Sequence, residues 1–537
     1  MESIKKEIPD LYDYQEQAIE KMMESEKSRS SICGIKGYIL AFEMGLGKTR
    51  TICELVKRTE NVEKKPTLVV EKKPTLVVCN KSVINVWVCE INKFFGKSIN
   101  YVVLFPGYCK DINIKNVEDY DIVITTYETI RKMFKQANPE CFIIAKSTFS
   151  YPETTLYKRD CIPEKHVILN VSKRYEKVDC YTPAFSIKWN RIITDETQKI
   201  TNYNTDISKA LRVMNANFYY CLSGTPIINY DSDLYSIFCF LGLEIKKKEW
   251  NKEFYDRHNL RQRIIIETKE TSNLTFPSIK YEVVTVKLSD IEKEYYNFLV
   301  KELKSAYALF QQGESTFAAP LSMFTKLRQV CACSYIIKPI NNTPSNLIEY
   351  VKKKRHIKKY TKVKKCIKII RNVIKRDEKI VIFSSFVEAL KSIEIVLKRK
   401  GIRFHHFDGS IKAETRDFII DEFNNNDKIK VFLSSYKAGG VGISLISANN
   451  VILLEPWWND ATEEQAISRV YRIGQTKPIT VYSLISEQSF ELYLLKIKNK
   501  KNEVYSDFIR GKPQKNSDVS IARMIINYIF RNYDEIK

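Results

Sequence analysis

The sequence of 537 residues contains little of what builds zinc sites and membrane spans. Its five histidines and thirteen cysteines include no Cys-x-x-Cys pair, and only Cys331 and Cys333 come near one. This spacing argues against a zinc partner and favours reduced, semi-buried thiols. No apolar run reaches the roughly 18 residues of a membrane-spanning helix, and residues 1–5 lead into no apolar segment. We therefore expect an intracellular protein with no membrane partner.

Acidic residues are outnumbered by basic ones. The chain has 87 Lys and Arg against 64 Asp and Glu, a formal net charge of +23. An excess of this size favours a polyanionic partner, because each cation that docks on a phosphate releases a counterion. Charge alone leaves a second interpretation open, in which the positive charge only keeps the protein soluble.

Short β-branched runs alternate with amphipathic stretches, a pattern that predicts an α/β fold with parallel sheets. Each half of the chain has enough candidate strands for one nucleotide-binding sheet. The expected strands are residues 38–41, 75–79, 121–125, 191–194 and 218–222, then 379–384, 430–434, 450–454 and 480–485. Residues 246–365 are polar and poor in such strands, which indicates helical protrusions and a linker.

Two segments interrupt this alternation. Residues 63–70 recur unchanged as residues 71–78, and only the second copy runs on into a strand, so we assign the strand there. A single duplication of eight residues is far too short for a repeat architecture. Residues 139–178 are long for a connection between strands, which predicts a surface insertion.

Residues 45–49 (GLGKT) have the composition of a phosphate-binding loop. Gly45 and Gly47 let backbone N–H groups turn toward phosphates, Lys48 would neutralise charge on the β- and γ-phosphates, and the Thr49 hydroxyl would bind Mg²⁺. The strict motif has glycine where Phe42 stands, so the match by itself also allows a structural glycine turn.

Asp195 and Glu196 directly follow an apolar strand. Parallel sheets bind ligands at the carboxyl ends of their strands, so this acidic pair is well placed for chemistry. Asp195 would hold Mg²⁺ and Glu196 would orient the attacking water. A turn or a helix N-cap is the alternative for an isolated acidic pair.

Arg469 and Arg472, near the other end of the chain, are three residues apart. We expect them on one face of a helix, where both would reach the γ-phosphate across a cleft. The ATP site would then be divided between the two halves of the chain and would open and close with each nucleotide cycle.

Taken in order, these segments resemble the motifs of the Swi/Snf family of duplex-DNA translocases, within helicase superfamily 2. The resemblance runs from about residue 11 to residue 491, and its global-transactivator subgroup is of similar size. It rests on residues 11–15 (LYDYQ), 40–49 (LAFEMGLGKT), 195–198 (DETQ), 222–227 (LSGTPI), 408–410 (DGS), 434–445, 456–459 (PWWN) and 465–475.

The resemblance implies two RecA-like parallel-sheet lobes joined by a helical linker and protrusion region. The implied domains are residues 1–245, 246–365, 366–500 and a tail of 501–537, whose amphipathic segment 519–530 should pack on the second lobe. The implied cofactors are ATP and Mg²⁺. Catalysis would use Lys48, Asp195, Glu196, Arg469 and Arg472, with Thr49 and Asp195 on the metal. ATP would be bound by Gln15, Glu43, Met44, Gly45, Leu46, Gly47, Lys48, Thr49, Gly442 and Gln475.

By the same resemblance, duplex DNA crosses both sheets and meets small residues and amides that track its backbone without reading sequence. The implied contacts are Lys81, Ser82, Thr125, Thr126, Ser384, Ser385, Gly439, Gly440, Trp458 and Asn459. Trp457 and Trp458 suit a hydrophobic core equally well. The lysine-rich segment 352–365 suits a nuclear-import signal, a DNA-facing linker or a solvated helix.

Several positions depart from the family pattern: Phe42, Asn80, Gln198, Ile228 and Tyr471. None removes a phosphate, metal or water ligand, so we expect a competent ATPase that moves on DNA and displaces bound protein in the nucleus, or in a host nucleus if the protein is viral. A strand-separating helicase and a DNA-binding regulator that uses the ATPase fold as a scaffold are the alternatives. The sequence gives no indication of the oligomeric state.

Overall fold

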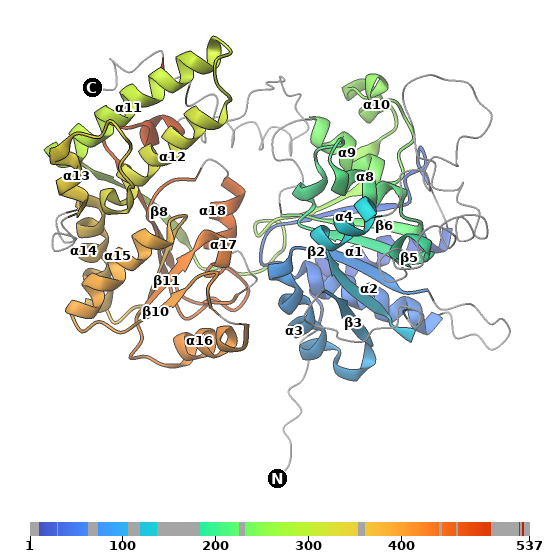
Figure 1. Cartoon of the computed structure of the whole chain (residues 1–537). Coiled ribbons are helices and arrows are strands. Elements are labelled where there is room, and N and C mark those ends of the chain that lie inside the picture. The colour runs from blue at the N-terminus through green and yellow to red at the C-terminus, as the bar shows by residue number, and fades with distance from the viewer. Residues whose placement is uncertain are drawn as a thin grey trace. The chain divides into compact units, whose positions relative to one another are not determined.

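The computed structural model describes residues 10–28, 31–62, 73–105, 117, 119–136, 183–224, 231–352, 360–411, 413–439, 443–457, 460–495, 526 and 529–530. The chain divides into two compact units, residues Met1–Leu274 and Thr275–Lys537. Each contains one sheet whose strands are all parallel, with helices on both sides (Figure 1). The α/β class with two RecA-like lobes is confirmed.

The first unit has a seven-stranded sheet in the order β3-β4-β2-β5-β6-β1-β7. Its strands are β1 (Gly37–Phe42), β2 (Thr75–Cys79), β3 (Tyr101–Leu104), β4 (Ile122–Thr126), β5 (Trp189–Asp195), β6 (Ala216–Leu222) and β7 (Ile264–Glu267). Its helices are α1 (Asp13–Ser28), α2 (Lys48–Val62), α3 (Ile84–Phe94), α4 (Tyr127–Gln136), α7 (Pro183–Ser186), α8 (Asp206–Val213), α9 (Asp231–Leu241) and α10 (Lys252–Arg257). The central strands β1, β2 and β4 are buried along their whole length, as continuous apolar runs in parallel sheets are.

The second unit has a six-stranded sheet in the order β10-β11-β9-β12-β13-β8. Its strands are β8 (Ile279–Val286), β9 (Ile380–Ser384), β10 (Phe404–Phe407), β11 (Val431–Ser435), β12 (Asn450–Leu453) and β13 (Ile479–Ser486). Its helices are α11 (Asp290–Gln311), α12 (Ala318–Cys333), α13 (Ser345–Lys352), α14 (Thr361–Lys375), α15 (Val387–Arg399), α16 (Ala413–Asn425), α17 (Tyr436–Gly439) and α18 (Asp460–Ile467).

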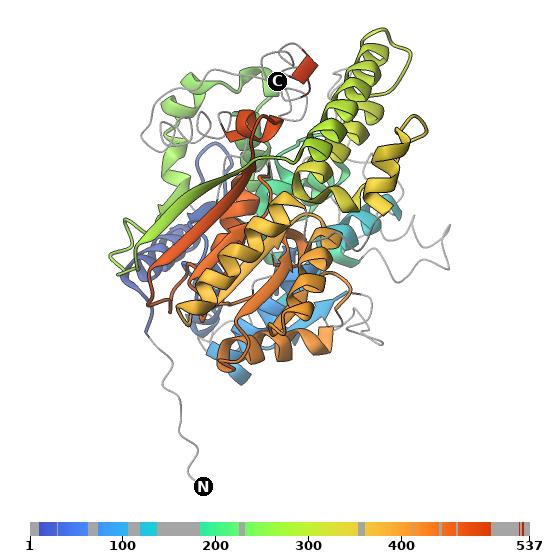
Figure 2. The same cartoon turned by 90° about the vertical axis from the view of Figure 1, so that its left-hand side faces the viewer.

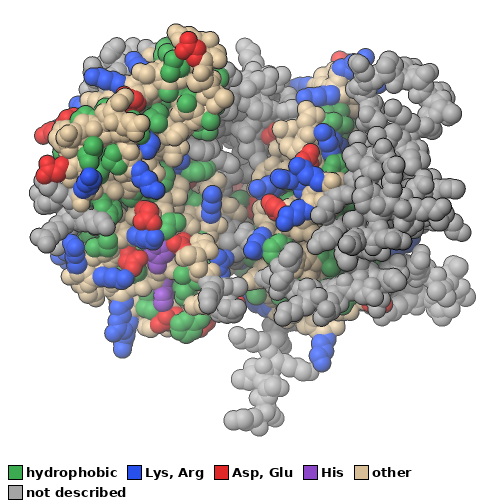
Figure 3. Space-filling model, viewed as in Figure 1, with side chains coloured by type: hydrophobic (Ala, Val, Ile, Leu, Met, Phe, Trp, Pro, Cys, Tyr) green, Lys and Arg blue, Asp and Glu red, His purple; other side chains and the backbone are tan. Residues whose placement is uncertain are grey.

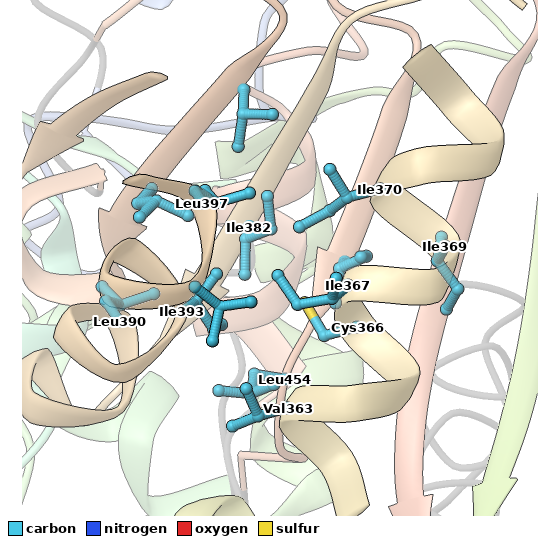
Figure 4. Close-up of a cluster of buried hydrophobic side chains, with 14 of the residues drawn as sticks. Val363, Cys366, Ile367, Ile369, Ile370, Ile382, Leu390, Ile393, Leu397 and Leu454 are labelled. Atoms are coloured by element: carbon cyan, nitrogen blue, oxygen red, sulfur yellow. The ribbon is translucent and has the colours of Figure 1, made fainter. Parts of the chain in front are cut away.

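Alternate residues of the central strands contribute to the cores on the two faces of the second sheet. Ile380 and Ile382 of β9 pack beneath α14 and α15, in the cluster shown in Figure 4. Val381 and Phe383 of the same strand face the opposite side and pack with α16. The period of two that a strand imposes therefore fixes which helices cover which face of the sheet.

The nine expected strands are all present, within two residues at each end. Four more, β3, β7, β8 and β10, are short or lie at sheet edges, where fewer apolar residues are needed. β7 and β8 fall within residues 246–365, where we expected few strands, and they extend the two sheets. The four-part division of the chain itself remains a prediction.

The duplicated segment is only partly within the described residues. Its second copy contains β2, as expected, while residues 63–70 and the expected insertion at 139–178 lie outside them. Cys331 and Cys333 are buried free thiols of α12. Ile526 and Ile529 pack against α11 and α12, so the C-terminal segment joins the second unit.

The described residues contain no group of three or more His, Cys, Asp or Glu side chains arranged to hold a metal ion. None of the described helices combines the length and the apolar character that crossing a membrane requires.

A buried ion pair ties the start of α14 to the segment after β13. The Lys362 Nζ atom donates to both carboxylate oxygens of Glu491, at 3.0 and 2.8 Å, and each side chain is only 1% exposed. Glu491 also accepts the backbone N–H of Ser486 at 2.6 Å. The carboxylate therefore depends on Lys362 for its counter-charge.

Lys362→Ala should destabilise the second unit by about 3–5 kcal/mol, because it leaves a buried carboxylate without a partner. The double variant Lys362→Met/Glu491→Gln should lose much less, since the Gln oxygen still accepts from Ser486 and no charge remains. Thermal unfolding of the whole chain measures both variants. A single variant as stable as the double one would contradict this account.

Candidate ATP and DNA site

The phosphate-binding loop connects β1 to α2. Gly45 and Gly47 have φ angles of 93° and 77°, a region that only glycine adopts at little cost. A Cβ atom on Gly47 would also lie 2.5 Å from Nε2 of Gln15. The positive φ angle is therefore the main reason for glycine at position 47, and a side chain there would also displace the Gln15 amide.

The start of α1 supports this loop from beside it. Both the Tyr14 hydroxyl (2.9 Å) and the Gln15 amide (3.2 Å) donate to the backbone carbonyl of Leu46. The Gln15 carbonyl oxygen accepts from the backbone N–H of Tyr12. Gln15, which resembles the adenine-side glutamine of its family, thus also holds the loop in place.

Lys48, at the first position of α2, donates through Nζ to the carbonyl oxygen of Phe42 at 2.8 Å. Phe42 itself is fully buried at the end of β1, where its ring meets the ring of Tyr14 edge-on. The departure from glycine at position 42 is therefore accommodated inside the core, away from the glycines that shape the loop.

Asp195 is the last residue of β5, two strands away from β1, and Glu196 follows it. The Asp195 carboxylate is buried and accepts the indole N–H of Trp87 at 2.9 Å. Burial and the neighbouring charge of Glu196 together raise the pKa of Asp195 to about 6, although Trp87 and Lys48 act in the opposite direction. A positive charge at this carboxylate would offset the cost of burying it.

The backbone turns sharply after the strand. Glu196 has a φ of 59°, in the left-handed region, and its carboxylate accepts from the side-chain amide of Gln198. The Tyr127 hydroxyl donates to the carbonyl oxygen of Asp195 at 2.8 Å. These contacts hold the two carboxylates in different surroundings, Asp195 buried and Glu196 half-buried.

The donor set fits a magnesium ion. Carboxylate and hydroxyl oxygens are the ligands this cation prefers, and Asp195 and Thr49 supply one of each. The buried carboxylate of Asp195 carries a charge that its surroundings only partly compensate. Both residues stand at the carboxyl edge of one sheet, on the elements β5 and α2.

β6 lies between the two halves of this edge. Leu222 pairs with Leu40 of β1 on one side and with Asp195 of β5 on the other. The Thr197 hydroxyl donates to the carbonyl oxygen of Leu222 at 2.9 Å. A Cβ atom on Gly224 would lie 2.9 Å from the side chain of Met44. The acidic motif therefore contacts the end of β6, and the residues that follow β6 contact the phosphate loop.

Glu43 has a structural partner that the sequence does not indicate. Its carboxylate accepts the backbone N–H of Lys269 at 2.8 Å and the Lys269 ammonium group at 2.6 Å. Glu43 thereby joins the loop to the segment that follows β7.

In the second unit, Glu455 is buried two residues after the end of β12. It accepts from the Ser384 hydroxyl at 2.9 Å and from the Ser385 backbone N–H at 2.6 Å. Burial raises the pKa of Glu455, and the bonds from Ser385 and the charge of Arg328 counteract this. Both serines are expected DNA contacts, and their side chains are fixed by this carboxylate.

Arg328 of α12 completes this arrangement. Its guanidinium group donates to the Ser385 hydroxyl at 2.9 Å and lies 4.3 Å from the ring centre of Trp457. Trp457 is half-buried by this contact, which favours the packing role over exposure to DNA. The helical protrusion thus positions residues at the sheet edge.

Gly439, at the end of α17, is required by close packing. A Cβ atom there would lie 2.6 Å from the ring of Phe383 and 2.9 Å from Oγ of Ser434. The other expected contacts in this part, Gly440, Gly442, Trp458 and Asn459, lie outside the described residues.

The expected helix through Arg469 and Arg472 is wrong. α18 ends at Ile467, and both arginines lie in the turns that follow. The carbonyl oxygen of Arg469 accepts from the backbone N–H of Leu445 at 2.8 Å, so it leaves the helical hydrogen-bond ladder. Arg472 donates to the carbonyl oxygen of Ile443. Both side chains stay partly exposed.

Gln475 is buried and its amide is used within the second unit. Its Nε2 atom donates to the carbonyl oxygens of Ala448 at 2.8 Å and Ile446 at 3.0 Å, and its Oε1 atom accepts from two backbone N–H groups. Binding ATP through this side chain would require these bonds to break. The structure gives Gln475 the role of bracing the turns that carry the arginines.

The expected DNA contacts of the first unit differ in exposure. Lys81 is exposed in the short helix η1 (Lys81–Val83), whereas Thr125 and Thr126 are buried at the end of β4. The Thr125 hydroxyl donates to the carbonyl oxygen of Leu104. The side chain of Ser82 is outside the described set. Among these residues, Lys81 therefore offers the exposed positive charge.

Comparison with known families decides the identity of this fold. Residues 14–336 match the model of the SNF2-related domain, and residues 359–474 match that of the helicase conserved C-terminal domain. The chain belongs to the SNF2-related family. The resemblance found in the sequence is confirmed, and this SNF2-related protein is an ATP-using enzyme, a DNA-dependent ATPase.

Two viral proteins are similar over nearly their whole length. The "Putative helicase 172L" of Invertebrate iridescent virus 6 is 28% identical, over 93% of this chain and 89% of that protein. The "Probable global transactivator" of Orgyia pseudotsugata multicapsid polyhedrosis virus is 26% identical, over 92% and 90%. The solved "Sulfolobus solfataricus SWI2/SNF2 ATPase core in complex with dsDNA" has 24% identity and a TM-score of 0.38, over 98% of this chain and 96% of that one.

Four residues of this SNF2-related ATPase were missed from the sequence: Trp87, Lys269, Arg328 and Glu455. Glu455 had a usable signal, because it follows an apolar strand directly, as Asp195 does. The other three are distant in sequence from the groups they contact, and no spacing rule links them.

Gly439→Ala should destabilise the second unit by about 1–3 kcal/mol, because the added methyl group overpacks Phe383 and Ser434. Gly409→Ala is the matched control, since a Cβ atom there meets nothing within 4 Å, and it should stay within about 0.5 kcal/mol. Thermal unfolding compares them. Equal melting temperatures would show that the packing at Gly439 has been misread.

Proposed function

We propose that this SNF2-related ATPase uses ATP hydrolysis to move along duplex DNA and to displace or remodel protein bound there, in the nucleus. The proposal rests on the carboxyl edge that β1, β5 and β6 share. At this edge the positive charge of Lys48 acts on the Asp195 carboxylate and lowers its pKa. Phosphate-binding loops and paired carboxylates in this arrangement serve phosphoryl transfer.

Each residue at this edge has a proposed role. The backbone N–H groups of the loop and the Lys48 ammonium group bind the β- and γ-phosphates. Thr49 and Asp195 would hold Mg²⁺, which when bound supplies charge neutralisation on the phosphates. Glu196, outside the buried position of Asp195, orients the water that attacks the γ-phosphate.

Arg469 and Arg472 are proposed to act from the second unit. Both side chains are partly exposed in the turns that carry them. The buried amide of Gln475 anchors this segment by donating to the carbonyl oxygen of Ala448. A guanidinium group stabilises the charge that develops on the transferred phosphoryl group. Such a role couples turnover to closure of the two units on one nucleotide, which converts hydrolysis into movement.

DNA contact is proposed for the loops that follow β2, β9 and β11. Lys81 supplies an exposed cation, and Ser385 and Gly439 stand at the carboxyl edge of the second sheet. On the face in view, Figure 3 shows Lys and Arg side chains on both units. Exposed cations and small polar side chains at these strand ends suit contact with the phosphate backbone.

ATP turnover should rise strongly with duplex DNA and less with single-stranded DNA or RNA, if duplex translocation is the function. Binding should weaken steeply with salt, by about 0.9 in log K per log salt for each phosphate contact, and should vary little with base sequence. Turnover and anisotropy over a salt series measure both. Preference for single strands would favour a strand-separating helicase, and preference for one duplex sequence would favour a regulator.

Lys48→Ala and Glu196→Gln should both abolish most turnover, but only the second should retain ATP binding.

Arg472→Ala should lower the DNA-stimulated rate by about a thousandfold while ATP binding changes little, because the arginine acts on the transition state. Arg472→Lys should rescue it poorly, since Lys lacks the planar guanidinium fork. Normal turnover by Arg472→Ala in saturating DNA would refute closure as the catalytic step.

A further inference from the structure

A pocket of about 730 Å³ lies along α14, on the side of the second sheet that α14 and α15 cover. Figure 2 shows α14 lying across this sheet beside β8. Seven of the fourteen lining residues are basic, and none of the fourteen is acidic. The basic residues, which define the cationic groove, are Lys287, Lys364, Lys365, Lys368, Arg371, Lys375 and Lys400.

The helical period places most of these charges in one row. Lys364, Lys368, Arg371 and Lys375 are spaced by four, three and four residues, so they share one face of α14 and are all exposed. At 1.5 Å per residue the row is about 16 Å long. The opposite face of the helix is buried in the core of Figure 4, through residues such as Ile370. The row is therefore held in a fixed position.

No carboxylate of the described structure forms an ion pair with any of the seven cations. Neighbouring lysines of the same unit do have partners: Lys362 pairs with Glu491, and Lys430 with Asp377. Seven cations gathered without an acid repel one another, and an external anion would relieve that repulsion. The groove thus has the electrostatic character of a binding surface for a polyanion.

We propose that the cationic groove binds the phosphate backbone of a second segment of duplex DNA. One DNA strand places a phosphate every ~3.4 Å along the helix axis, so a row of about 16 Å spans several phosphates. Thr285 and Asn372, both exposed in the lining, offer further hydrogen bonds to phosphate oxygens.

The lining offers an acidic protein segment few exposed apolar side chains to contact. Protein partners are anchored by apolar side chains that enter exposed pockets. The apolar lining residues Val363, Ile367 and Val396 are buried in the core of the second unit. Cations and small polar groups are what remains at the surface, and these suit a phosphate backbone.

Most of this surface lies away from the strand ends that carry the family motifs. Ser384, Ser435 and Glu455 stand at the carboxyl ends of β9, β11 and β12. The groove begins at the carboxyl end of β8, two strands away from β12, where Lys287 lies. From there it extends along α14 to Lys375 and Lys400, which lead into the amino ends of β9 and β10. One chain could then hold two duplex segments. The inference rests on the proposed function for the identity of the polymer.

The test compares two double variants of the full chain. Lys368→Gln/Arg371→Gln removes two charges from the groove, and Lys301→Gln/Lys428→Gln removes two exposed charges elsewhere in the same unit. Binding of a labelled 15-base-pair duplex is followed by anisotropy to saturation over a salt series. Wild type and the control should bind two duplexes, and the groove variant one. Its summed salt dependence should fall below the control's by about 0.9 for each phosphate contact of the lost site, which includes at least the two contacts of Lys368 and Arg371.

ATP turnover with the same duplex separates this inference from the proposed function. If both hold, the duplex stimulates the groove variant as it does wild type. If the duplex stimulates no variant but the groove variant still loses one bound duplex, the proposed function fails and the groove site stands. Equal stoichiometry and salt dependence in both double variants overturn the inference. Poly-glutamate that then binds wild type but not the groove variant would reassign the groove to an acidic protein.

Discussion

A carboxylate buried at the end of a central strand is the constraint on which both units depend. Asp195 ends β5 in the first unit, and Glu455 follows β12 in the second. Burial raises the pKa of each, so each must be compensated locally to remain charged. The first unit does so with an indole N–H and a lysine, and the second with two serines and an arginine.

The compensation recruits elements that are far apart in the chain. Trp87 comes from α3, and Tyr127, which bonds the backbone of Asp195, from α4. Arg328 comes from the helical protrusion and reaches the residue next to β9. Since a buried charge without partners is costly, these contacts hold the strand ends at defined positions. The helices thereby do more than cover the sheets: they set the geometry of the edges on which nucleotide and DNA are proposed to bind.

The sequence predicts those parts in which local chemistry decides the structure. Strands such as β2 and β9 are continuous apolar runs, and the loop at Gly47 needs an unusual backbone that few residues permit. Prediction from the sequence fails where a group distant in the chain determines the local structure. The helix expected through Arg469 ends at Ile467, and the carbonyl oxygen of Arg469 accepts the backbone N–H of Leu445 instead of one from a following helical turn. β8 was missed because Lys280 and Glu282 interrupt its apolar run, while Tyr281 and Val283 lie at exposed positions of this edge strand.

The lysine-rich segment before β9 shows how charge counts mislead and how periodicity corrects them. Its charge alone would predict that every lysine of the segment lies on a solvated helix surface. Lys362, however, shares a face with Cys366, Ile369 and Val373, at spacings of four, three and four, and is buried against a glutamate 129 residues away. The lysines two and six positions later fall on the opposite face and remain exposed. Equal charges on one helix thus serve stability on one face and are available for recognition on the other, a division that the 3.6-residue period already contains.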